Sequence, residues 1–222
     1  MKNGMYKVAA TAALLCSVSL AQAEQSKVMY KITITNITAN ISFTPVLAAT
    51  HWGSLKLFEV GKPASDELVA IAEGGDIEPL KSVWEESRRV FDVDNTEGLL
   101  APGHSMSLTM GGSMRNPRSG RFSMASMLLP TNDTMVSLNG VKLPYSGSRT
   151  YLVNAYDAGS EPNDELCVNI PGPTCGGEPL SPAVDGEGYV YPSPTTHGEG
   201  DLPVSEYGWS GPVAKVTIKR MY

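Results

Sequence analysis

The sequence has only three histidines in 222 residues, and they stand far apart at His51, His104 and His197. None has a spacing typical of a zinc site, and His51 beside Trp52 is expected to be a packed, hydrogen-bonded side chain. A nucleophile elbow is also missing. Residues 103–107 approach the G-x-S-x-G pattern but lack its last glycine and lead into a strand, not a helix. These residues therefore show no zinc pattern and no serine nucleophile. A carboxylate pair for glycoside hydrolysis stays open, because its spacing depends on the fold, but nothing in the sequence favours it.

Long apolar runs are absent beyond the N-terminus, so no transmembrane segment is predicted. The one apolar run, residues 8–20, follows two lysines and precedes Ala-Gln-Ala at residues 21–23, a pattern that signal peptidase recognises. We therefore expect residues 1–23 to be a cleaved signal peptide, with Cys16 a small apolar residue of its core. Residues 24–222 are expected to form one exported domain, periplasmic or extracellular.

Basic residues are outnumbered, with 17 lysines and arginines against 23 acids and a net charge of −6. Removal of residues 1–23 takes away two lysines and no acid, so the net charge of the mature chain becomes −8. A surface of this sign repels nucleic acid and anionic lipid and attracts cations. The composition therefore predicts no nucleic-acid partner.

Cysteines beyond residue 23 are limited to Cys167 and Cys175. Disulfides persist in exported proteins, so these two are expected to bond to each other and close a short loop rich in proline and glycine. The chain-entropy estimate gives such a loop a stabilisation of about 2.5 kcal/mol. A metal–thiolate site is the alternative, but no histidine or third cysteine lies nearby in the sequence.

Alternating polar and apolar residues predict most of the strands. Residues 29–35 alternate in this way and are rich in β-branched types. Further strands are expected at residues 90–93, 104–110, 121–129, 136–138, 151–156 and 213–219. Turn clusters separate them, including residues 111–113 and 116–117. Short strands separated by turns predict an antiparallel β-sandwich. Residues 171–212 hold eight of the sixteen prolines, so we expect a long loop before the last strand closes the domain.

Two short helices are expected to interrupt the strands. From Ser65 the apolar residues fall at helical spacing, with Ser65 as the N-terminal cap and Gly74 as the C-terminal stop. A second helix is expected near Asp76, and Pro79 restricts its start to a nearby residue. The predicted fold is therefore mostly β, an antiparallel β-sandwich with two short helical insertions.

Residues 157–161, Asp-Ala-Gly-Ser-Glu, follow the strand expected at 151–156 and place a carboxylate at each end of a glycine turn. This arrangement allows Asp157 and Glu161 to point at one centre. Calcium takes roughly 6–8 oxygen ligands and tolerates irregular geometry. Asp, Gly and Ser are also ordinary turn residues, so the five residues alone leave a solvated turn and a cation site open.

Several stretches, in this order, resemble the spondin domain, a module of extracellular-matrix proteins and bacterial secreted proteins. The resemblance lies in residues 30–33, 51–53, 58–75, 130–133, 156–159 and 213–218. It implies a β-sandwich related to C2-like folds, with one Ca²⁺ ion bound by loops at one end. The positions that match the family's ligands are Asp133, Asp157 and, with a glutamate in place of aspartate, Glu161. Asp164 is the alternative to Glu161 as third ligand.

The same resemblance implies a secreted, calcium-binding, non-enzymatic module for adhesion or surface recognition. Its partner would be a protein or a glycan of a surface or matrix, and the residues give no indication of the oligomeric state. Two alternatives belong to other classes. One is a calcium-dependent lipid-binding module of the C2-like type, for which basic or apolar loop tips near the ion are expected. The other is a metal-assisted hydrolase, which needs a polar cleft with a base near the ion.

Overall fold

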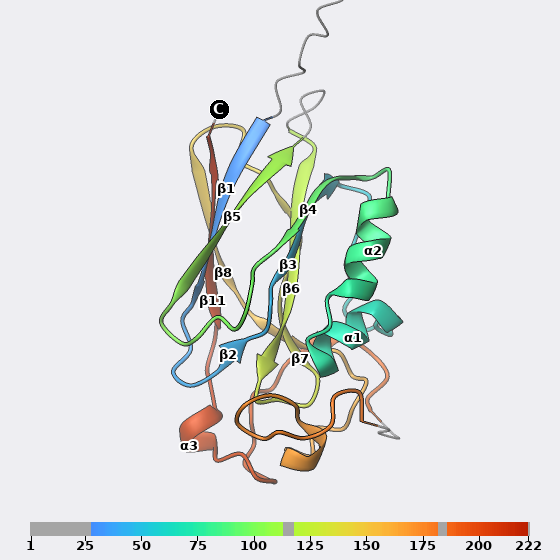
Figure 1. Ribbon diagram of the computed structural model, residues 1–222, viewed down its shortest axis with the longest axis vertical. Coiled ribbons are helices and arrows are strands. Elements are labelled where there is room, and N and C mark those ends of the chain that lie inside the picture. Colours follow the sequence, from blue (N-terminus) through green and yellow to red (C-terminus); the bar gives the residue numbers. More distant parts are fainter. Residues whose placement is uncertain (1–27, 113–117, 182–185, 222) are drawn as a thin grey trace, which may run out of the picture.

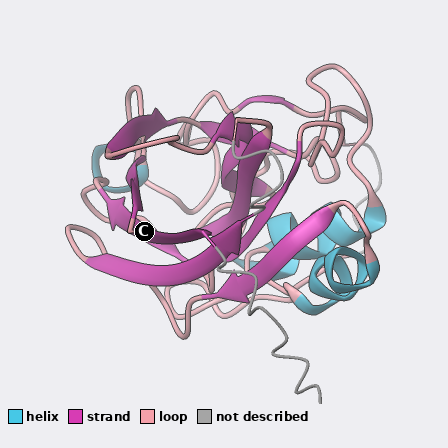
Figure 2. Ribbon diagram, turned by 90° about the horizontal axis from the view of Figure 1, so that it is seen from above, coloured by secondary structure: helices cyan, strands magenta, loops and turns pink. Residues whose placement is uncertain are grey.

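The computed structural model describes residues 28–112, 118–181 and 186–221, which form an antiparallel β-sandwich with helices outside one sheet (Figures 1 and 2). The expected signal peptide and the turn predicted at residues 116–117 lie outside the described residues. One sheet has four strands in the order β5 (Ser105–Gly112), β1 (Val28–Asn36), β11 (Ala214–Arg220), β8 (Ser148–Val153). Among the described residues, no helix is long and apolar enough to cross a membrane.

The second sheet has seven strands. Six of them follow in the order β10 (Tyr191–Pro192), β9 (Ala155–Asp157), β7 (Thr134–Lys142), β6 (Gly120–Leu129), β3 (Leu47–Trp52), β4 (Val90–Asn95). The seventh, β2 (Ser42–Phe43), pairs with β6. The helical elements are α1 (Asp66–Gly74), α2 (Glu78–Glu86), a 3-10 turn η1 (Cys167–Asn169) and α3 (Val204–Tyr207).

Two apolar clusters separate the layers. Between the sheets lie alternate residues of most strands, such as Ile32 and Ile34 of β1 and Phe122 of β6. Between the larger sheet and α1 and α2 lies a second cluster that includes Leu68 and Trp84. Strand β6 is buried along most of both faces because it contacts both clusters. The structure is therefore a three-layer arrangement, and none of the described helices covers the outer side of the four-stranded sheet (Figure 1).

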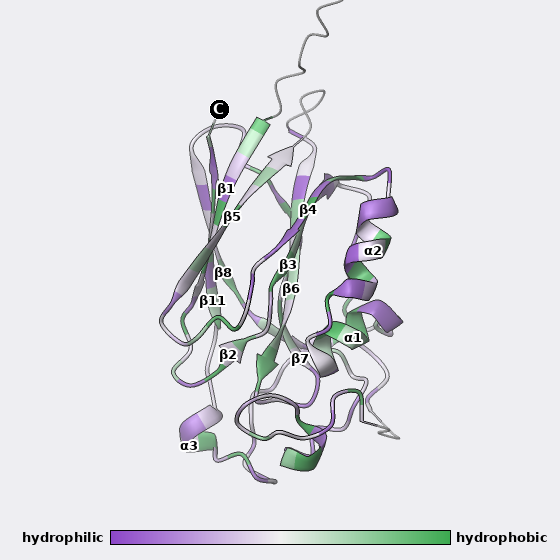
Figure 3. Cartoon of the chain, viewed as in Figure 1, coloured by the Kyte–Doolittle hydropathy of each residue, from purple (hydrophilic) through white to green (hydrophobic). Residues whose placement is uncertain are grey.

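Both predicted helices are confirmed. Ser65 caps α1, accepting a hydrogen bond from the backbone N–H of Leu68, and Pro79 lies in the first turn of α2. Hydrophilic and hydrophobic residues share α2, as Figure 3 shows. The stop is displaced by one residue, since Gly74 is still helical and Gly75 adopts the left-handed φ of 65°. A side chain at Gly75 would also meet Thr44 Cγ2 at 2.6 Å.

The structure corrects two strand predictions. Residues 151–156 are not one strand, because the chain changes sheets at Asn154, leaving β8 in the smaller sheet and β9 in the larger. Gly111 and Gly112 continue β5, where a turn is predicted, because β1 extends beside them as a partner. At Gly112 a Cβ would lie 2.7 Å from the ring of Tyr30, so glycine allows the close approach of these two strands.

Candidate metal centre

The three predicted ligands belong to the segment between β6 and β7 and to the end of β9 with the loop after it. These loops lie at one end of the sandwich, the lower end of Figure 1. Asp133 occupies the turn between β6 and β7, Asp157 ends β9, and Glu161 follows in the next loop. Pairing of β7 with β9 sets Thr134 opposite Asp157, and the backbone N–H of Ala158 donates to the Asp133 carbonyl at 3.1 Å. All three side chains are buried, with exposed fractions of 0, 0 and 1%.

The turn that carries Asp133 is held by its neighbours. Thr131 Oγ1 donates to the Leu128 carbonyl at 2.6 Å and accepts from the Thr134 N–H at 3.3 Å. The Asn132 side chain donates to Asp164 Oδ1 at 2.9 Å and accepts from the Glu165 N–H at 3.1 Å. Both sides of the turn are therefore tied down, one to the end of β6 and the other to the loop after Glu161.

One carboxylate oxygen of Asp133 accepts several hydrogen bonds, and the other accepts none from the described residues. Oδ2 accepts hydrogen bonds from Ser160 N, Ser160 Oγ and Glu161 N at 2.8, 3.2 and 3.1 Å. Oδ1 is buried and has no hydrogen-bond partner in the described part of the chain. Burial, followed by the charge of nearby Asp157, raises the pKa of Asp133 to about 8.

Asp157 makes hydrogen bonds through both carboxylate oxygens. Oδ1 accepts from the Gly159 N–H and Oδ2 from Asn163 Nδ2, each at 2.8 Å. Burial raises the pKa of Asp157 despite these bonds. The loop needs glycine at Gly159, which has φ of 67°, because a Cβ there would lie 2.3 Å from the Tyr189 carbonyl oxygen. The conformation of this turn therefore depends on both residues, since the Gly159 N–H binds the Asp157 carboxylate and only glycine fits at position 159.

The Glu161 carboxylate interacts electrostatically with a second group of acids. Its Oε1 accepts from Ser181 Oγ at 2.5 Å, while Oε2 is buried with no partner in the described part of the chain. Burial raises the pKa of Glu161 to about 7, and the charges of Glu73 and Asp164 add to the rise. Glu73 is a buried residue of α1 whose own pKa is raised by burial. Its position on an amphipathic helix gave no indication that it would face Glu161.

Asp164, the alternative third ligand, is occupied differently. Its Oδ1 accepts from Asn132 Nδ2 and from the Leu166 N–H, each at 2.9 Å, and its Oδ2 accepts from Asn169 Nδ2 at 2.7 Å. Both oxygens of Asp164 therefore hold the loop together. Glu161 is the member of the pair with a free buried oxygen.

The donor set of Asp133, Asp157 and Glu161 consists of carboxylates, a ligand type of hard cations. Within residues 28–112, 118–181 and 186–221, no three carboxylate, imidazole or thiolate side chains enclose a common ion position. Two buried carboxylate oxygens, Asp133 Oδ1 and Glu161 Oε2, nevertheless have no hydrogen-bond partner among those residues. Burial raises the pKa of both acids and so disfavours their charged form, and a bound cation would favour that form. Carboxylate oxygens are the ligands that calcium prefers, so these two oxygens are candidate ligands.

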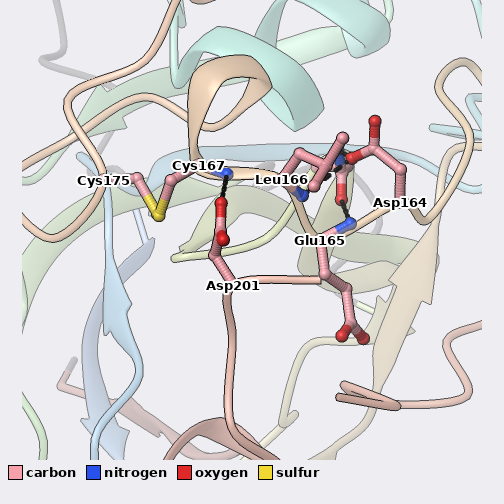
Figure 4. Close-up of a disulfide and its surroundings, with 7 residues drawn as sticks. Asp164, Glu165, Leu166, Cys167, Cys175 and Asp201 are labelled. Atoms are coloured by element: carbon pink, nitrogen blue, oxygen red, sulfur yellow. Dashed lines mark hydrogen bonds between the residues drawn. A yellow bond between two sulfur atoms is a disulfide. The ribbon is translucent and has the colours of Figure 1, made fainter. Parts of the chain in front are cut away.

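A disulfide closes the neighbouring loop, as predicted. Cys167 and Cys175 are bonded, which makes the thiolate alternative wrong for them. Figure 4 shows the Cys167 N–H donating to Asp201, at 2.9 Å from Oδ2. The nearby Glu165 carboxylate accepts from the backbone N–H groups of Gly198 and Glu199 at 2.7 and 3.0 Å. The disulfide loop and the 197–201 segment therefore pack as one unit beside the acids.

His51 has the packed role that the sequence predicts. The ring is fully buried, with Nε2 2.8 Å from Ser123 Oγ and Nδ1 2.8 Å from the Trp52 carbonyl oxygen. It lies on β3, away from the loops that carry the acids. His104 is an exposed residue just before β5.

Fold and site together define a β-sandwich module with buried acids in its end loops and a disulfide beside them. The family model Spondin_N, the spondin N-terminal domain, matches residues 26–164, and the chain belongs to this family. The match includes Asp133, Asp157 and Glu161 but ends before the disulfide loop and β11, so it is shorter than the resemblance predicted. The comparison with curated proteins finds no match. Family and disulfide fit an extracellular protein of the adhesion type.

Proposed function

We propose that this protein is an exported, non-enzymatic adhesion module whose end loops bind one calcium ion through Asp133, Asp157 and Glu161. The observation that carries the proposal is the pair of buried, unpartnered carboxylate oxygens on Asp133 and Glu161. Glu161 is preferred to Asp164 as third ligand because Glu161 keeps a buried oxygen without a partner among the described residues. Asp157 also accepts hydrogen bonds through both oxygens, and it is kept as a ligand because its charge acts on Asp133.

The chain's own residues pre-organise the site. Ser160 and Glu161 donate backbone N–H groups to Asp133 Oδ2, which leaves Oδ1 as its free oxygen. Asn163 and the Gly159 N–H hold the Asp157 carboxylate in position. Bound calcium supplies positive charge against carboxylates that otherwise repel one another in a buried setting. The loops then present a surface of defined shape to a partner.

A non-enzymatic role is proposed from the adhesion-type character of the family. His51 is buried against Ser123, away from the acids, whereas His197 Nδ1 lies 3.7 Å from Glu165 Oε1. A metal-dependent hydrolysis screen of the wild type and of His197→Gln tests the proposal, and hydrolysis that is lost in the variant would refute it.

Thermal melting with and without calcium tests the metal site. Extracellular calcium modules bind with dissociation constants of about 10⁻⁴–10⁻³ M, and a tenfold excess over that constant stabilises the folded state by about 1.4 kcal/mol. For a domain of this size the melting temperature should rise by about 3–6 °C over that in chelator. Asp157→Asn should abolish the rise, while Glu86→Gln, which removes an exposed acid of α2, should keep it. Identical melting curves of the wild type in both buffers would refute calcium binding.

A second candidate function is calcium-dependent membrane contact, because apolar side chains are exposed near the acids. Leu166, Val168 and Leu180 are 42, 69 and 50% exposed, and all lie in or beside the disulfide loop. Sedimentation with anionic vesicles separates this function from adhesion. Calcium-dependent pelleting that is lost in Val168→Ser would establish it, and absence of pelleting would leave adhesion as the proposal.

A further inference from the structure

The outer side of the four-stranded sheet is a second surface with a defined chemistry. Because alternate residues of β1 and β11 point into the core, those between them point outward. They include Lys31, Lys215 and Lys219, all exposed. We call this outer side of β5, β1, β11 and β8 the basic face. Figure 1 shows it on the side of the sandwich opposite α1 and α2.

Hydroxyl groups cross the basic face in a row. Strand register places Ser107, Thr33, Thr217 and Thr150 opposite one another across the four strands. Thr33 and Ser107 are joined by a hydrogen bond of 3.0 Å, as are Thr150 and Thr217. Neighbouring strands lie about 4.8 Å apart, so the row is a flat, regularly spaced series of donors and acceptors.

The charge of the basic face opposes that of the whole chain. The four strands contain no aspartate or glutamate, although the chain has 23 acids. Lys31 stands directly opposite Lys219, and like charges in that position are destabilising. Within the described residues, no hydrogen bond or ion pair engages the ammonium groups of Lys31, Lys215 or Lys219. Three ammonium groups therefore stand on the face without an ion pair to any described residue.

The combination of these features selects one kind of partner. We propose that the basic face binds a linear anionic polysaccharide, its carboxylate or sulfate groups pairing with Lys31, Lys215 and Lys219. The threonine and serine row then exchanges hydrogen bonds with the sugar hydroxyls. Single-stranded nucleic acid is disfavoured because the outward positions opposite Thr33 and Thr35 on the other strands carry no aromatic side chain for base stacking. The proposal names a partner for the proposed adhesion role but uses a surface other than the calcium loops.

Binding to dextran sulfate, followed by titration calorimetry, tests the charge. The wild type should bind dextran sulfate and not neutral dextran. The variant Lys31→Gln, Lys215→Gln, Lys219→Gln should bind at least tenfold more weakly. Its control, Lys56→Gln, Lys62→Gln, Lys81→Gln, loses the same charge outside the four-stranded sheet and should stay within twofold of wild type. Equal weakening in both triple variants would overturn the proposal.

A second variant tests the hydroxyl row. Thr33→Val, Thr150→Val, Thr217→Val keeps shape and strand propensity while removing three hydroxyls, and should weaken dextran sulfate binding at least threefold. Unchanged affinity would show that the basic face binds polyanions through charge alone, and it would overturn the proposed recognition of sugar hydroxyls. Tighter binding to vesicles containing phosphatidylglycerol than to dextran sulfate, lost in the lysine variant, would assign the face to a membrane instead.

Repeating the titration in chelator separates this inference from the calcium proposal. The strands of the basic face are held by backbone pairing, so affinity for dextran sulfate should be the same in chelator and in calcium. A protein that shows no calcium-dependent melting but binds dextran sulfate would refute only the metal site. Circular dichroism of all three triple variants checks that they remain folded.

Discussion

At the scale of single residues, the site combines what local sequence indicates with what only the fold supplies. Residues 157–161 show their cation-loop pattern in five positions, and the structure buries both acids of that pattern. Asp133 lies 24 residues earlier, and no local pattern connects it to Asp157. Resemblance to the family identified it, and pairing of β7 with β9 explains its position. Glu73 could not be anticipated, because an acid near the end of an amphipathic helix is ordinarily solvated.

Asp133→Asn should show separately how the buried carboxylate affects stability and how it affects calcium binding. An amide keeps an oxygen for the Ser160 and Glu161 N–H groups, and its nitrogen can donate toward Asp157, which removes an unpartnered buried carboxylate. In chelator the variant should be more stable than wild type by about 1–3 kcal/mol. Added calcium should no longer raise its melting temperature. A variant less stable than wild type in chelator would show that Oδ1 is satisfied in solution.

His51 should make the protein sensitive to mild acid. Burial lowers its pKa below the ordinary value of 6.5, outweighing the hydrogen bond to the Trp52 carbonyl, and the Arg121 charge lowers it further. The unfolded chain therefore binds a proton that the folded state does not, so stability falls as pH drops below about 6.5, by at most about 1.4 kcal/mol per pH unit.

Urea unfolding between pH 7 and pH 5 measures this effect. The decline should be shallower in His51→Gln than in wild type, whatever the stability of the variant at pH 7. The raised pKa values of Asp133, Asp157 and Glu161 act in the opposite direction, but they are present in both proteins and cancel in the comparison. Parallel pH curves would show that His51 charges freely in the fold.

At the scale of elements, alternation located the strands but not the sheets to which they belong. Along residues 151–156 the alternation of buried and exposed side chains continues without interruption, while the hydrogen-bonding partner changes from β11 to β7. A pattern of side chains contains no information about which strand lies beside it, so one strand was predicted where two exist. Gly111 and Gly112 illustrate the converse, since their turn-like composition is overridden by pairing with β1.

The disulfide should stabilise the loop end of the molecule. Cys167 and Cys175 are eight residues apart, and the chain-entropy estimate for that loop is about 2.5 kcal/mol. Reduction, or Cys167→Ser with Cys175→Ser, should lower the free energy of unfolding by that amount. Thermal melts with and without dithiothreitol measure it. The double variant serves as control, because its melting temperature should not respond to the reductant.

At the scale of the whole molecule, the net charge predicts repulsion of polyanions, whereas the placement of the lysines favours binding of a polyanion on one sheet. The total of −6 indicates repulsion of polyanions, and composition alone supports nothing else. Antiparallel register brings lysines of β1 and β11, which are almost 190 residues apart in the chain, into adjacent positions. Strand pairing decides whether a lysine lies opposite another lysine or opposite an acid. No local sequence pattern determines which strands pair.

Because Lys31 and Lys219 are paired across neighbouring strands, one substitution should raise the stability of the fold and weaken polysaccharide binding. Lys219→Glu replaces a like-charge pair on neighbouring strands with an ion pair, and cross-strand pairs of opposite charge contribute roughly 0.2–1 kcal/mol. The variant should therefore unfold at a higher urea concentration than wild type while binding dextran sulfate at least tenfold more weakly. Ile218→Ala, next to it but in the core, should instead cost about 2–5 kcal/mol and leave affinity unchanged at temperatures where the protein is folded. If Lys31 and Lys219 repel each other but both bind the polysaccharide, Lys219→Glu should stabilise the fold and abolish binding. A Lys219→Glu variant that binds dextran sulfate as well as wild type would show that these lysines do not bind the polyanion.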